Sequence, residues 1–139
     1  MSARTKARKR AIDILYSADV RQTTIEDALA AEAVRASSEP DRQASWLYAR
    51  EIVDGVVDHR EEIDELIETY SQGWTLSRMP MIDRAILRIG IWEILFNDAV
   101  PHAVAIDEAV EAAKILSTND SAGFVNGLLG RIAQTAPSA

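Results

Sequence analysis

The sequence of 139 residues contains no cysteine, which excludes disulfides, thiolate metal ligands and a cysteine nucleophile. It also contains no uninterrupted apolar run of about 18 residues, the length that a membrane-spanning helix needs. The basic N-terminal stretch is followed by no apolar segment of the kind found in secretory signals. We therefore expect a cytoplasmic protein that makes no contact with a membrane.

Residues suited to catalysis are scarce. His59 and His102 are the only histidines, and there is no Gly-rich phosphate loop and no serine-hydrolase or zinc-protease motif. His59 lies one helical turn from Glu62, which is either half of a metal site or, as we interpret it, part of a solvated helical face. Other acids are expected on solvent-facing sides of helices: Asp83, Glu93, Asp107, Glu108 and Glu111. We predict no enzyme activity, no metal site and no cofactor.

Strands are not indicated, because no segment alternates between apolar and polar residues over a useful length. Apolar residues instead recur at three- and four-residue steps along most of the chain. The sequence Thr23–Glu26 has the form of a capping box and predicts a helix that continues to about Val34. A break is expected at residues 58–60, a helix start at Pro80, a helix start at Asp120 or Ser121, and a frayed tail from about Thr135.

These patterns predict an all-α fold. We expect one domain over residues 1–139, built from about seven helices, with Trp74 and Leu76 held against the core. The segment from Met81 to Phe96 is apolar nearly all round, which is typical of a central, buried helix.

Charge is distributed unevenly along the chain. The net charge is −7, yet the first ten residues carry five basic side chains and no acidic one. The remainder carries 10 basic and 22 acidic side chains. This asymmetry indicates either a basic arm for an anionic partner or a disordered basic leader that keeps the terminus soluble.

The basic cluster coincides with a helical pattern over residues 4–18. Ala7, Ala11, Ile14, Leu15 and Ala18 form one apolar stripe. The basic side chains are predicted to lie opposite this stripe (Lys6, Lys9, Arg10) or at its flanks (Arg4, Arg8). A helix rooted in the core by this stripe favours the basic arm over the disordered leader.

Two of the few aromatic residues differ from the rest. Tyr16 follows the basic cluster on the same helix, and Phe124 lies near the start of the last helix. Exposed aromatic rings beside cationic side chains suit single-stranded RNA, because bases stack on the rings while Lys and Arg neutralise phosphates. The amide of Asn126 either reads a base edge or caps a backbone group.

Five segments, in order from about residue 4 to 132, resemble the NusB family. They are Arg8–Tyr16, Ile52–Val56, Asp83–Ile89 with Trp92–Ile94, Val100–Lys114, and Phe124–Leu129. Each is weak alone, but the ordered set is specific.

The resemblance implies a compact helical protein with two sub-bundles and a role in transcription antitermination. It implies binding to the boxA sequence of ribosomal RNA leaders together with NusE, a small-subunit ribosomal protein, in a complex with RNA polymerase and other Nus factors. The implied RNA-binding residues are Arg4, Lys6, Arg8, Lys9, Arg10, Tyr16, Phe124 and Asn126. The implied NusE contacts include Asp83 and Arg88 on the central helix.

The chain departs from the family pattern at three positions. Asp107 stands where the family usually has Asn, Gly123 replaces an often basic residue, and Thr5 interrupts the basic run. These changes predict weaker RNA affinity without loss of function. The alternative reading is a protein-only adaptor or homodimer whose basic helix contacts an acidic surface.

Overall fold

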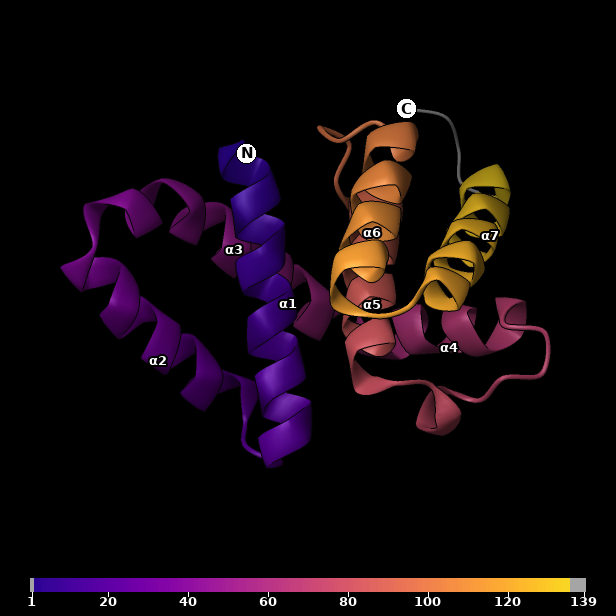
Figure 1. Cartoon of the computed structure of the whole chain (residues 1–139), viewed down its shortest axis with the longest axis horizontal. Helices are drawn as coiled ribbons and strands as arrows, with labels where there is room; N and C mark the ends of the chain where they lie inside the picture. Colours follow the sequence, from indigo (N-terminus) through magenta and orange to yellow (C-terminus); the bar gives the residue numbers. More distant parts are fainter. Residues whose placement is uncertain (1, 136–139) are drawn as a thin grey trace. The chain divides into compact units, whose positions relative to one another are not determined.

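The computed structural model describes residues 2–135, apart from the side chains of residues 40–42 and 44. Over this range the backbone is helical with no β-strand, so the all-α prediction is confirmed (Figure 1). None of the described helices is long and apolar enough to cross a membrane. The helices are α1 (Ala3–Arg21), α2 (Ile25–Ser38), α3 (Pro40–Asp58), α4 (Arg60–Tyr70), the 3-10 helix η1 (Leu76–Arg78), α5 (Met81–Phe96), α6 (His102–Leu116) and α7 (Asn119–Thr135). Most of the tail expected to fray lies outside the described residues.

The chain divides into two compact units, and the division falls inside α3 between Asp54 and Gly55. The first unit contains α1, α2 and most of α3. The second contains the end of α3 and the helices from α4 to α7.

Helix α1 is fixed at both ends by short-range hydrogen bonds. The Ser2 hydroxyl accepts from the Thr5 amide, and Gln22 ends the helix with a left-handed backbone (φ 54°). The apolar stripe predicted from the sequence is buried, and Ile12 joins it. Burial of this stripe anchors α1 in the first unit.

Helix α2 begins one residue later than the sequence predicted, because its N-cap is Thr24 and not Thr23. Thr24 has an extended backbone, and its hydroxyl accepts from the Asp27 amide, so the capping pair is Thr24–Asp27 rather than Thr23–Glu26. The helix continues to Ser38, beyond the expected end near Val34. The predicted break at residues 58–60 is confirmed, because α3 ends at Asp58 and α4 begins at Arg60.

Helix α5 is the centre of the second unit. It is buried from Ala85 to Ile94 and packs against α4, α6 and α7, as its apolar sequence predicted. Contact with α7 is close: a Cβ atom at Gly90 would lie 2.8 Å from Leu129 Cδ1. Glycine at this position therefore sets the distance between the two helices.

Three local predictions were wrong. Asp83 and Glu93 are each 1% exposed instead of facing solvent. Asp83 is held inside because Ser121 Oγ donates to its Oδ2 at 2.7 Å. Helix α7 starts at Asn119, ahead of both expected caps, because Thr118 Oγ1 accepts from the Ser121 amide.

Candidate nucleic-acid interface

Among the five basic residues in the first ten positions of the chain, three have exposed side chains, namely Arg4, Lys6 and Lys9. Tyr16 is 39% exposed and lies seven residues, or two helical turns, beyond Lys9. Seven-residue spacing puts two side chains on the same helical face. The exposed surface of α1 therefore carries Lys9 and Tyr16 on one face, with Lys6 one turn before Lys9.

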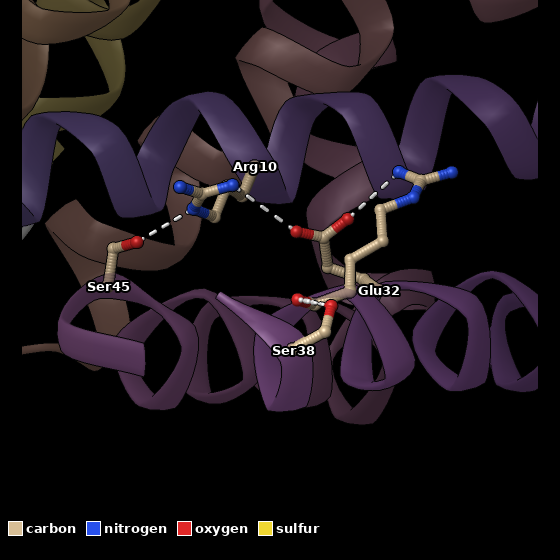
Figure 2. A network of polar contacts seen from close by, with 5 residues as sticks. Arg10, Glu32, Ser38 and Ser45 are labelled. Atoms are coloured by element: carbon tan, nitrogen blue, oxygen red, sulfur yellow. Dashed lines mark hydrogen bonds and ion pairs between the residues drawn. The ribbon is translucent and has the colours of Figure 1, made fainter. Parts of the chain in front are cut away.

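Arg10 is turned toward the neighbouring helices (Figure 2). Its Nε donates to Ser45 Oγ of α3 at 2.7 Å, and its Nη1 lies 3.3 Å from Glu32 Oε1 of α2. Arg35 approaches the other Glu32 oxygen at 3.0 Å, so Glu32, which is 5% exposed, holds two guanidinium groups. The charge of Arg10 is thus partly neutralised within the first unit.

Arg8 is only 6% exposed, although the sequence placed it at the edge of the apolar stripe. Its guanidinium lies 5.9 Å from the centre of the Tyr48 ring of α3, and that of Arg4 lies 5.2 Å from the same ring. The signal for this burial was present in the sequence, because Arg8 is three and seven residues from the buried Ala11 and Leu15.

A groove of about 160 Å³ lies between α1 and α2 beside the Arg10–Glu32 pair. Acidic and basic residues both line it, among them Asp13, Asp27 and Arg21. Partial burial raises the pKa of Asp13 above its ordinary 3.8, and Glu32 acts in the same direction, against the lowering effect of Lys9, Arg10 and Arg35. The mixed charges give this groove no preference for an anion.

The predicted residues of the second unit occupy different faces of α7. Phe124 is half-buried, and its ring centre lies 5.3 Å from that of Trp74 at a tilt of 45°. Asn126 is exposed, but two residues along a helix correspond to a turn of about 200°, so its side chain starts from the opposite side. Trp74 itself is 51% exposed, which corrects the expectation that it is held in the core.

Asp83 and Arg88, predicted to contact NusE, both lie inside the second unit. Arg88 makes a bidentate pair with Asp64 of α4, with Nε–Oδ1 and Nη2–Oδ2 distances of 2.9 and 3.2 Å. Asp83 accepts from Ser121 as described above. In this structure the two residues connect α5 to α4 and to α7.

His59 is only partly solvated, with 35% of its side chain exposed. Its ring stacks on that of Phe96 with 3.8 Å between centres and 9° between planes. Glu62 lies 3.7 Å from His59 Nδ1. The described residues contain no group of three or more His, Asp or Glu side chains suited to a metal ion. The stacking makes His59 a packing residue at the break between α3 and α4.

The sequence matches the family described as "NusB family" over residues 5–134. The transcription antitermination protein NusB of Leifsonia xyli subsp. xyli is 74% identical over 137 residues, which are 99% of this chain and 95% of that protein. The protein of the same name from Clavibacter michiganensis subsp. michiganensis is 69% identical, covering 97% of this chain and 98% of that one.

Solved structures with the same fold include NusB of T. maritima, with a TM-score of 0.85 and 34% identity over 96% of this chain and 92% of that one. A second is a chain from a crystal structure of antitermination factors NusB and NusE in complex with double-stranded RNA. It has a TM-score of 0.82 and 28% identity, and it covers 96% of this chain and 98% of that one.

Proposed function

The chain belongs to the NusB family, and from that premise we propose that it binds the boxA sequence of ribosomal RNA leader transcripts together with NusE and helps RNA polymerase to avoid premature termination. As a member of this family it is a transcription antitermination factor and not an enzyme. Its place of action is the cytoplasm, in a complex with RNA polymerase and other Nus factors.

The observation that carries this proposal is the exposed face of α1. Lys6 and Lys9 supply cations for phosphates, and Tyr16 supplies a ring for a base on the same face. Arg4 is exposed one turn before Arg8 and adds a third cation at the surface. Arg8 and Arg10 keep α1 packed in the first unit, and they place the exposed cations by holding the helix.

NusE as a partner is supported by the similar chain that was crystallised with NusE and RNA. We propose that NusE contacts the second unit near α5. Asp83 and Arg88 are buried there, so they act on that surface by fixing α4 and α7 against α5.

The test is the salt dependence of binding to a boxA-containing oligonucleotide, measured by fluorescence anisotropy. Three exposed cations predict that log Kobs falls against log[salt] with a slope of about −2, at roughly −0.7 per phosphate of a single strand. The double variant Lys6→Gln/Lys9→Gln should weaken binding and make the slope shallower by about 1.4.

Lys114→Gln is the matched control, because Lys114 is an exposed lysine of α6 that pairs with the exposed Glu111. It should leave both affinity and slope unchanged. A flat salt response of the wild-type chain contradicts the proposal. The protein-only adaptor would give that result, together with full binding to NusE.

A further inference from the structure

Trp74 presents a large apolar ring to solvent. About half of the residue is exposed, on a connector that links α4 to η1. An indole ring is a costly group to leave in water, at roughly 25 cal/mol per Å² of apolar surface. The exposed part of the Trp74 ring is therefore available to contact a ligand.

The turn that carries Trp74 is held in a defined shape. Gln72 and Gly73 both have left-handed backbones, with φ of 58° and 98°. The Ser71 side chain is buried, and its hydroxyl bonds to the carbonyl oxygens of Glu68 and Trp74. These bonds close the turn.

Helix α7 holds the same turn from the other side. Arg131 Nη2 donates to the Tyr70 carbonyl at 2.8 Å, and Phe124 meets the Trp74 ring. Phe124 and Arg131 are seven residues apart, so they share one face of α7. One face of α7 therefore contacts this turn through both the Phe124 ring and the Arg131 guanidinium.

Glycine at position 127 leaves room beside the Arg131 guanidinium. Gly127 lies between Phe124 and Arg131 on this face, and a Cβ atom there would already be 3.3 Å from Arg131 Nη1. The tilt of 45° keeps the two rings from stacking face to face, so each retains ring surface for a further planar group.

We propose that Trp74 is a second base-stacking residue, which with Phe124 and Arg131 forms a binding site for an unpaired base and its phosphate in single-stranded RNA. This proposal rests on the proposed function and names the part of the RNA that the second unit takes. Stacking on a ring is tolerant of sequence, and the fixed guanidinium supplies the positive charge that a phosphate requires.

The test compares Trp74→Ala and Trp74→Phe in the full chain, with a boxA-containing oligonucleotide in the presence and absence of NusE. Trp74→Ala should raise Kd about fivefold or more, at 1–3 kcal/mol per stacked base and 1.4 kcal/mol per tenfold. Trp74→Phe keeps a ring and should restore most of the affinity. Leu47→Ala, which removes another exposed apolar side chain, should have no effect.

Oligonucleotides with one base removed at a time locate the contact. At the position that stacks on Trp74, loss of the base should weaken wild-type binding but should add little to the Trp74→Ala variant. The melting temperature of Trp74→Phe should match that of the wild type, because a ring that can pack against Phe124 is kept, and its RNA affinity therefore separates loss of stacking from loss of folding.

Several results would overturn the inference. If Trp74→Ala binds the oligonucleotide as tightly as the wild type, while Lys6→Gln/Lys9→Gln does not, the second unit takes no base at this ring and the proposed function stands. If Trp74→Ala loses affinity for NusE alone, the ring contacts protein instead. If the wild-type chain binds no RNA with or without NusE, the proposed function and this inference fall together.

Discussion

At the scale of single residues, Lys9 and Arg10 are neighbours in the chain with different surroundings. Lys9 is exposed on the face that carries Tyr16, whereas Arg10 reaches Glu32 and Ser45. An ion pair removes much of the field that a phosphate would sense. The contribution of a cation to RNA binding on α1 therefore depends on which way its side chain is turned.

The raised pKa of Asp13 can be tested through the pH dependence of stability. Because burial raises its pKa above 3.8, the folded chain holds a proton on Asp13 more tightly than the unfolded chain does. Ionisation of Asp13 thus lowers the free energy of unfolding as the pH rises through the raised pKa. Asp13→Asn should melt at a higher temperature than the wild type at pH 7, and the difference should vanish below pH 3.8. A constant difference across this range would contradict the assignment.

Gly55 provides a test of packing in the second unit. A Cβ atom at this position would lie 2.0 Å from Nε1 of Trp92, which is 5% exposed. Gly55→Ala should lower the free energy of unfolding by about 1–3 kcal/mol, measured by urea denaturation. Gly123→Ala is the control, because a Cβ there meets nothing within 4 Å, and it should stabilise by about 0.4–1 kcal/mol.

At the scale of the helices, Glu32 connects three elements of the first unit. It lies on α2, pairs with Arg10 of α1 and with Arg35 one turn further along α2, and Arg10 continues to Ser45 of α3 (Figure 2). Its carboxylate is buried, so its loss removes the ion pair of the half-buried Arg10.

Glu32→Ala should therefore destabilise the chain by about 1–3 kcal/mol in urea denaturation. Glu111→Ala removes an exposed ion pair with Lys114 and should change stability by less than about 0.5 kcal/mol. Equal effects of the two substitutions would show that the buried network adds nothing beyond a surface pair.

The helices themselves follow closely from the sequence. The apolar stripe of α1, the break at residues 58–60 and the buried α5 each come from spacing that depends on local geometry alone. The start of α2 was misplaced by one residue because Thr23 and Thr24 are both good caps. Which hydroxyl accepts is decided by backbone conformation, which residue type does not reveal.

The site is less predictable, because it depends on contacts between helices. Spacing placed the basic residues on α1, but only the fold turns Arg10 toward Glu32, 22 residues away. Trp74 looked like a core residue because indole rings are usually buried. Its exposure depends on two consecutive left-handed residues, of which only Gly73 had a recognisable preference for that conformation.

At the scale of the whole molecule, RNA and NusE are expected to bind with mutual dependence. If both ligands are held in one complex, NusE should tighten RNA binding, and RNA should tighten NusE binding by the same factor. A coupling of about 1–3 kcal/mol corresponds to roughly 5- to 150-fold. Titrations of either ligand in the presence and absence of the other measure this factor, and the mass of the chain in solution should be recorded alongside. Equal RNA affinities with and without NusE would show that the two ligands bind independently, which contradicts this prediction.

The contact between positions 10 and 32 constrains how relatives of this chain can diverge. A lineage that replaces the arginine with an uncharged residue has no further need of an acid inside the unit, so the two positions should change together. Lys6 and Lys9 are instead exposed to solvent. At these two positions selection should preserve positive charge while tolerating exchange of Lys for Arg.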